Sequence, residues 1–149
     1  MPQTEAFSAQ QSYISVGDSA SPNTYTEVAE VKNIGGPNEA AEEIDVTHLR
    51  SPGSYREFLQ SFKDGGEIPI VANYIPTHST HGSGSGGVRG LFASGAVRGW
   101  RITLADGTLL YFDGWVKAIG TPVQVGNAVE LNFTIRVSGA VTVDEVEAA

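Results

Sequence analysis

The sequence predicts a single, mainly β domain with one short helix, and three observations support this prediction. Its 149 residues are the usual size of one domain. Apolar residues make up 40% of the chain and occur in short runs between Gly, Pro, Asn and Asp; none approaches the ~18 residues that a membrane span needs. The 18 glycines are more than an average composition gives, which favours strands, bulges and turns over helices.

The first half of the chain predicts strands separated by strong breakers. Residues 12–16 alternate weakly and precede a turn-rich stretch, which suits a first strand. Residues 24–34 are rich in β-branched side chains and end at Gly-Gly-Pro, so they predict a second strand. Residues 38–43 suit a short helical turn. Residues 44–47 alternate apolar with polar, as a half-buried strand does.

The clearest helix is expected between Ser51 and Gly65. Ser54 and Glu57 stand at the spacing of a capping box, and Pro52 suits an early helical position because no amide donor is needed there. Four large side chains then follow at i, i+3, i+4 and i+7, which places them on one stripe of a helix. The prediction is a structural helix stripe that packs on the sheet, formed by Tyr55, Phe58, Leu59 and Phe62.

The second half predicts the most regular strands. Residues 67–75 suit a strand in which Pro69 points to an edge or a bulge. The segments on either side of Asp106-Gly107 predict a tight hairpin. In residues 129–137, Val129, Leu131, Phe133, Ile135 and Val137 face one way, and Glu130, Asn132, Thr134 and Arg136 face the other. A brief apolar segment then leads into a loose acidic tail at about 144–149.

Residues 77–90 predict a flexible loop, since they are rich in glycine and nearly free of apolar side chains. Gly82, Gly84 and Gly87 match the spacing G-x-G-x-x-G, but a dinucleotide site needs a strand before it and a helix after it. Neither is predicted here. His78 and His81 stand three apart, a spacing that binds metal on a helix, but no cysteine or carboxylate lies nearby. A loop is therefore expected rather than a cofactor or metal site.

Composition excludes several functions. The absence of cysteine excludes disulfides, cysteine-based zinc sites and thiol nucleophiles. The net charge of −8 and the pI near 4.7 oppose the binding of DNA phosphates. Six carboxylates crowd one stretch and predict a solvated face that repels phosphate: Glu27, Glu30, Glu39, Glu42, Glu43 and Asp45.

Two further groups of residues have a chemical and a structural interpretation. Asp45 and His48 could serve Ser51 or Ser54 as acid and base, but no G-x-S-x-G segment marks a nucleophile, and both serines suit a helix start. Arg98 and Arg101 flank Trp100, as in some nucleic-acid-binding surfaces. In an acidic chain, cross-strand pairing of these arginines is the favoured interpretation.

The order of these parts resembles a known family. Ile44-Asp45-Val46-Thr47-His48-Leu49 leads into the expected helix and then Lys63-Asp64-Gly65-Gly66. Trp100-Arg101-Ile102 precedes the Asp-Gly turn, Phe112-Asp113-Gly114-Trp115-Val116 follows it, and a closing strand ends at Val137-Ser138-Gly139. In this order the chain resembles the tail tube proteins of long-tailed bacteriophages with non-contractile tails.

The resemblance implies a β-sandwich or half-barrel, a single tail tube domain over residues 1–149, similar in fold to the type VI secretion tube protein. It implies that six copies form a ring and that rings stack into a hollow tail, through which DNA passes without specific binding. The implied partners are other copies of the chain and the tail terminator, tape measure and tail tip proteins. The implied location is the virion tail, and the host cytoplasm during assembly. No enzymatic activity, cofactor or membrane association is implied.

With this resemblance, two sets of residues become candidates for assembly. A negatively charged lumen is expected to be lined by Glu130, Asn132 and Thr134. A loop that orders only between stacked rings is expected to use His78, His81, Gly84, Val88, Arg89 and Leu91. Two rival interpretations stay open. One is a carbohydrate- or protein-binding β-sandwich with Trp100, Tyr111 and Trp115 as stacking rings. The other is a cupin-like metal enzyme, and it is the weaker of the two because the chain has only three histidines and none lies on a predicted core strand.

Overall fold

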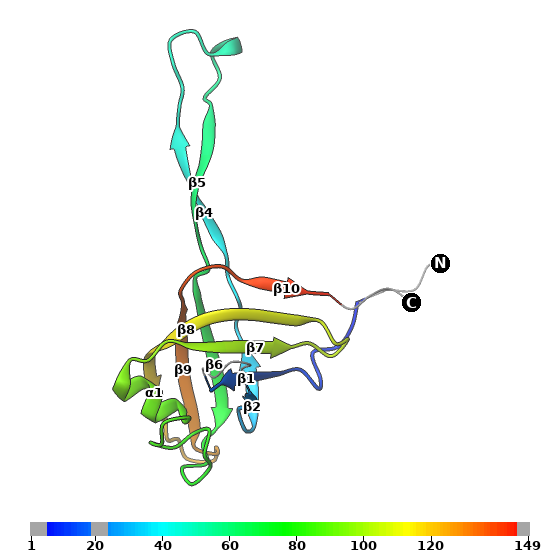
Figure 1. The fold of residues 1–149 in the computed structure, drawn as a ribbon, viewed down its shortest axis with the longest axis vertical. Coiled ribbons are helices and arrows are strands. Elements are labelled where there is room, and N and C mark those ends of the chain that lie inside the picture. The colour runs from blue at the N-terminus through cyan, green and yellow to red at the C-terminus, as the bar shows by residue number, and fades with distance from the viewer. Residues whose placement is uncertain (1–5, 19–23, 146–149) are drawn as a thin grey trace.

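The structure is a computed structural model that describes residues 6–18 and 24–145 (Figure 1). Its body is an antiparallel sheet in the order β2-β1-β7-β8-β9-β6-β3, with β10 paired to β8. A two-stranded hairpin, β4 and β5, projects from one end of this body. The mainly β fold with one short α-helix is therefore confirmed. The strands of the body are β1 Tyr13–Gly17, β2 Tyr25–Glu27, β3 Val31–Ile34, β6 Glu67–Asn73, β7 Arg98–Thr103, β8 Leu109–Gly120, β9 Glu130–Val137 and β10 Thr142–Asp144.

The buried apolar residues of the described chain form one core cluster, which β1, β6, β7, β8, β9 and α1 all supply. Trp100 is buried against Phe133, with ring centroids 6.4 Å apart, and its Nε1 donates to the Gly114 carbonyl at 3.2 Å. The helix α1 (Val88–Ser94) adds Val88 and Leu91 to the same core. Residues far apart in the sequence therefore depend on one another for burial.

Three of the expected elements are confirmed closely. β1 begins one residue after the expected start, and β7 and β8 form the hairpin around Asp106-Gly107. Only Gly107 of this pair has a positive φ, 95°, and Leu104 N–H donates to the Thr108 carbonyl to close the turn. Along β9, buried and half-buried residues alternate without interruption, as the sequence pattern predicts.

Two strand details differ from the expectation. Residues 24–34 form two strands, β2 and β3, because the chain turns at Glu30, whose φ is 51°, while Val28 is buried between them. Pro69 lies within β6, which pairs with both β9 and β3, so it is not on an edge strand, and it pairs with Thr134 in regular register rather than at a bulge. The pairing of β3 with β6 ends at Ile34. Beyond it, Gly35 N–H donates to the Pro69 carbonyl, so the ladder does not need the backbone N–H that Pro69 lacks.

The helix expected between Ser51 and Gly65 is wrong, and so is the helical turn expected at residues 38–43. The structure has β4 (Ala40–Asp45), the short 3-10 helix η1 (Pro52–Ser54) and β5 (Phe58–Asp64). The register shift between Ala41 and Glu43 adds one residue to β5 between Gln60 and Lys63, which interrupts the alternation of β5 and contributes to the helix-like spacing of Phe62. Pairing with β4 satisfies the backbone instead. The four stripe residues pack on no sheet and are exposed by 77%, 48%, 59% and 82%: Tyr55, Phe58, Leu59 and Phe62.

The segment 77–90 also differs from the expected loop. It ends in the first turns of α1, whose Val88 and Leu91 are each 1% exposed, and His81 is fully buried. The expectation that this segment has nothing of its own to bury is wrong. Of the expected acidic tail, Asp144 belongs to β10, and residues 146–149 lie outside the described part of the chain. Within the described ranges, no helix is long and apolar enough to span a membrane.

Candidate functional site: the hairpin arm and the glycine loop

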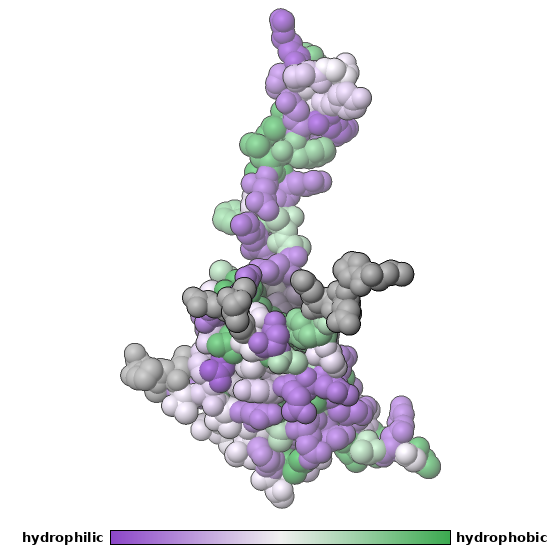
Figure 2. Space-filling view, turned by 90° about the vertical axis from the view of Figure 1, so that its right-hand side faces the viewer, coloured by the Kyte–Doolittle hydropathy of each residue, from purple (hydrophilic) through white to green (hydrophobic). Residues whose placement is uncertain are grey.

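The most unusual surface of the molecule is the arm, residues 40–64, formed by β4, β5 and the turn between them. It stands clear of the body, and its side chains alternate between apolar and polar along its length (Figures 1 and 2). A lone two-stranded hairpin is marginally stable in water. The arm nevertheless leaves seven large apolar side chains exposed: Ile44, Val46, Leu49, Tyr55, Phe58, Leu59 and Phe62. Exposed apolar side chains of this kind mark a surface that binds another molecule.

One face of the arm combines these apolar side chains with a carboxylate. Ile44 and Leu59 are direct cross-strand partners, exposed by 49% and 59%. The extra residue of the register shift lies in β5, so alternation along β4 places Glu42 on the same side as Ile44, and Val46 directly follows β4 with its N–H donated to the Glu57 carbonyl at 2.9 Å. We call these four residues, Glu42, Ile44, Val46 and Leu59, the Ile44 face.

The carboxylates of the arm divide into paired and unpaired groups. Asp45 accepts from Arg56 at 2.9 Å, and Asp64 accepts from Arg136 at 2.7 Å. Hydrogen bonds from Thr47 lower the pKa of Asp45, and the hydrogen bond from Arg136 lowers that of Asp64. The side chains of Glu39, Glu42 and Glu43 make no ion pair with the described residues, so they remain available to a cation on another molecule.

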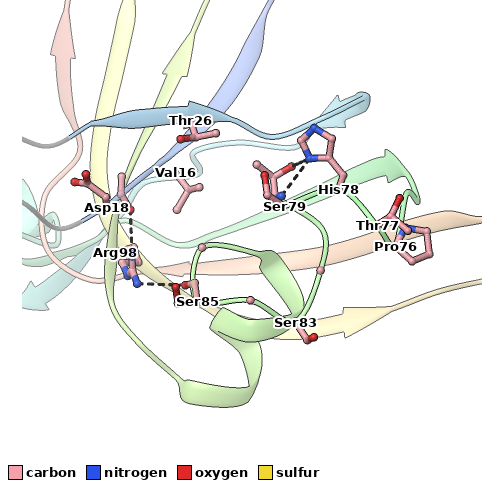
Figure 3. A pocket seen from close by; sticks show the side chains of 15 residues that line it. Val16, Asp18, Thr26, Pro76, Thr77, His78, Ser79, Ser83, Ser85 and Arg98 are labelled. Atoms are coloured by element: carbon pink, nitrogen blue, oxygen red, sulfur yellow. Dashed lines mark hydrogen bonds between the residues drawn. The ribbon is translucent and has the colours of Figure 1, made fainter.

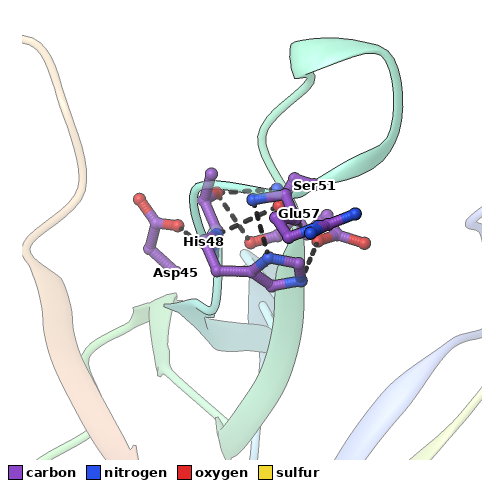
Figure 4. Close-up of polar contacts among 6 residues, drawn as sticks. Asp45, His48, Ser51 and Glu57 are labelled. Carbon is purple, nitrogen blue, oxygen red and sulfur yellow. Dashed lines mark hydrogen bonds and ion pairs between the residues drawn. The ribbon is translucent and has the colours of Figure 1, made fainter.

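The turn of the arm holds the residues that could resemble a catalytic triad (Figure 4). Ser51 Oγ donates to Glu57 Oε2 at 2.6 Å, and the His48 amide donates to Ser51 Oγ at 3.0 Å. The His48 ring lies 3.6 Å from Glu57 Oε2, while its Nδ1 accepts from the Arg50 amide at 3.1 Å. The serine hydroxyl is thus bonded to a carboxylate and not to the imidazole. This arrangement closes the turn and lacks the serine–base contact that nucleophilic catalysis needs.

The glycine loop, residues 76–87, lies at the other end of the body, beside α1 (Figure 1). Its glycines allow close backbone packing: a Cβ on Gly87 would lie 2.2 Å from the Gly82 carbonyl, and one on Gly90 would lie 2.0 Å from that of Gly84. A helix does follow Gly87, contrary to the expectation, but β6 ends at Asn73, well before the first glycine. Within the spacing G-x-G-x-x-G, Gly87 therefore serves close packing within the chain, whereas a Cβ on Gly84 would meet nothing within 4 Å.

A polar cleft of about 640 Å³ separates this loop from the ends of β1 and β2 (Figure 3). Arg98 closes one side of the cleft, since its guanidinium donates to the carbonyls of Gly17 and Ser85, both at 3.2 Å. Arg101 instead pairs across strands with Ser15 and Tyr111 and lies 4.6 Å from the centre of the Tyr25 ring. These contacts support a structural role for Arg98 and Arg101 rather than a role in binding nucleic acid.

His81 holds the glycine loop to the body. Its Nδ1 accepts from the Ile75 amide at 3.0 Å, so its Nε2–H donates to the Ala29 carbonyl at 2.7 Å. Burial lowers the pKa of this imidazole, which favours its neutral form. His78 bonds to Thr80 with its Nδ1. Both histidines have structural partners, and no cluster of three metal-ligating side chains occurs within residues 6–18 and 24–145.

The candidate lumen residues lie on the outer face of β9. Glu130 forms an ion pair with Lys32 at 2.7 Å, and neighbouring pairs join Lys117 to Glu67 and Arg136 to Asp64. Asn132 Oδ1 is buried without a partner among the described residues. The carboxylates of this face are therefore matched one to one by cations, a feature that alternation along a single strand could not reveal.

The carbohydrate-binding alternative loses one of its three rings, because Trp100 is 1% exposed and lies in the core. Tyr111 and Trp115 are half-buried on β8, where Tyr111 meets Tyr25 edge to face at 6.1 Å. Two half-buried rings on one strand do not form an open stacking platform.

Comparisons with known proteins agree with this geometry. The profile of the family described as "Lambda phage tail tube protein, TTP" matches residues 10–144. A search of curated proteins finds no match. A chain of "Virion of native gene transfer agent (GTA) particle" is 17% identical with a TM-score of 0.73, over 94% of this chain and 100% of that one. A chain of "Tail of empty GTA particle computed with helical refinement, C6 symmetry" is 16% identical with a TM-score of 0.73, at the same coverage. A chain of the sheath/tube terminator of an extracellular contractile injection system is 10% identical with a TM-score of 0.71, over 95% and 99%.

The mainly β fold matches that of tail tube proteins. The chain belongs to the lambda phage tail tube protein family. It is thus a structural subunit of the tail tube of phage-like particles, and this family assignment supports a structural rather than an enzymatic role. Its place in such a particle is the tail.

Proposed function

We propose that this chain forms hexameric rings that stack into a hollow tube, in which the arm of each copy binds another copy. The observation that carries the proposal is the arm: seven large apolar side chains stay exposed on a two-stranded hairpin that has no layer of its own to pack against. The reported sixfold symmetry of a tail with the same fold supports the number six. Assembly with a terminator, tape measure and tip protein, beginning in the host cytoplasm, completes the proposal.

We propose further that the outer face of β9 lines the lumen, through Glu130, Asn132 and Thr134. The net charge of −8 supports a tube that repels DNA phosphates at long range. On this face, Lys32 and the two neighbouring cations offset the carboxylates, so the wall itself would be polar and nearly balanced. Such a wall would neither bind nor trap a passing polyanion.

An arm-deletion variant tests the proposal. Residues 40–64 are replaced by a short Asn-Gly turn that joins β3 to β6. The sixteen buried apolar residues found within residues 6–18 and 24–145 all lie outside the arm, so the body should fold with its core complete. The expected result is that the full chain forms tubes visible by electron microscopy at high concentration and that the variant stays monomeric. Tubes of ordinary length from the variant would overturn the role of the arm, and failure of the full chain to form rings or tubes would overturn the proposed function.

A further inference from the structure

The surface of α1 that faces away from the core carries an unpaired cation beside apolar side chains. Arg89 and Phe92 stand three residues apart in the helix and so lie on one side, while Val88 and Leu91 fill the core on the other. Phe92 is 40% exposed, and Val97, shortly beyond the helix, is 54% exposed. Arg89 forms no ion pair within the described residues. We call Arg89, Phe92 and Val97 the α1 surface.

The α1 surface and the Ile44 face have complementary chemistry. The Ile44 face offers one unpaired carboxylate, Glu42, beside Ile44 and Leu59. The α1 surface offers one unpaired cation beside two apolar side chains. A contact between them would bury apolar area on both sides and pair both charges, which are the two features that favour a specific interface.

Their positions suit contact between copies and not within one copy. The arm leaves one end of the body along its longest axis, and α1 lies near the opposite end (Figure 1). When copies stack head to tail along this axis, the arm of one copy approaches the α1 end of the next. The contact joins two different surfaces, so it does not close on itself and can be repeated without limit.

We propose that the α1 surface is the acceptor for the Ile44 face of the arm of another copy, with Arg89 pairing Glu42. This inference rests on the proposed function and adds to it the receiving residues. The occupant is a second copy of this chain because the arm supplies a carboxylate that can pair with Arg89 and apolar side chains that can cover Phe92 and Val97.

A charge-reversal cycle tests the pairing. Arg89→Glu and Glu42→Lys each place like charges in the contact, and each should raise the critical concentration for tube formation by about 10-fold. The double variant restores the pair in reverse and should return this concentration to within about 3-fold of the parent value. Lys117→Glu is the control: it breaks an ion pair with Glu67 inside one copy, away from the proposed contact, and Glu42→Lys should not rescue any loss of assembly that it causes.

Cross-linking gives an independent measurement, because the chain has no cysteine of its own. Single variants Glu42→Cys and Arg89→Cys are mixed under tube-forming conditions and treated with a short bis-maleimide linker. The expected product is a dimer containing one of each variant, while Lys117→Cys mixed with Glu42→Cys should give none.

The outcomes separate the two levels of the proposal. If the parent protein forms tubes but neither the double variant restores assembly nor the mixed dimer appears, the α1 surface is not the acceptor, and the proposed function stands. If the parent protein forms no tubes, the proposed function itself fails. Restored assembly together with the mixed dimer supports both.

Discussion

Replacing Leu59 with alanine separates the stability of the free subunit from its assembly. Full burial of a leucine side chain stabilises by about 1.5–3 kcal/mol. Leu59 is 59% exposed on the arm, so folding of one copy gains less than half of this, and Leu59→Ala should lower the free energy of unfolding by at most about 1 kcal/mol. The remaining burial is gained only when another copy covers the arm. Losing that part, about 0.9–1.8 kcal/mol, corresponds to a rise of about 4- to 20-fold in the critical concentration.

Leu131→Ala is the matched control, since the same chemical change is made at a residue that is 0% exposed in the core. It should cost about 2–5 kcal/mol of folding free energy. Unfolding is measured in denaturant at concentrations where the protein is monomeric, and assembly is measured by pelleting over a concentration series. The reasoning is refuted if Leu59→Ala destabilises the monomer as much as Leu131→Ala, or if the critical concentration does not change.

Three further predictions concern the body. Gly90→Ala should destabilise the monomer by about 1–3 kcal/mol, because its Cβ would meet the Gly84 carbonyl, whereas Gly84→Ala meets nothing within 4 Å and should be nearly neutral in thermal unfolding. Burial lowers the pKa of His81 below its ordinary 6.5, so the unfolded state takes up this proton at a higher pH than the folded state, and stability should fall as the pH drops below about 6.5; a flat profile down to pH 5 would contradict this. Glu130→Lys should still form tubes, but these tubes should retain DNA in co-sedimentation at low salt, and parent-like release would remove Glu130 from the lumen.

Acid below this range acts on a different part of the molecule. The pKa values of Asp45 and Asp64 are lowered, so the stability that their hydrogen bonds contribute is present above their ordinary value of 3.8 and is lost only as the pH falls further, through their folded values. Both carboxylates are exposed, so this effect is small. The two pH windows therefore distinguish His81 from the arm.

The strands β7, β8 and β9 could be predicted from the sequence because each carries its own local signal. β9 alternates over its whole length since one face meets the core and the other meets solvent. The β7–β8 hairpin depends on the positive φ of Gly107, which the Asp-Gly pair indicates directly. In both cases local preference and tertiary packing favour the same structure.

The arm could not be predicted because its apolar side chains are not buried within the chain and, in the proposed assembly, contact another copy instead. Apolar side chains normally indicate burial within one domain, so the sequence predicts a packed helix stripe of Tyr55, Phe58, Leu59 and Phe62. In the structure they lie on an exposed hairpin whose irregular register imitates a helical spacing. The signal that could have revealed the arm is the pair Gly35-Gly36 and Gly65-Gly66, which bracket the segment where it leaves the body.

The glycine loop differs from its prediction for another physical reason. A high glycine content predicts flexibility, but at Gly87 and Gly90 glycine permits contacts with backbone carbonyls that no side chain would allow. The sequence predicts that Val88 and Leu91 are buried only by a neighbouring ring. This is wrong, because both side chains are already buried in the core of their own chain. A stacking role for the other candidates, His78, His81, Gly84 and Arg89, stays a prediction.

A helical reconstruction by electron microscopy of the purified chain, assembled at high concentration, tests the central claim most directly. The account predicts stacked rings in which the arm of each copy lies against a neighbouring copy and Leu59 is buried. Tubes in which every arm extends into solvent, or a protein that stays monomeric at all concentrations, would contradict it.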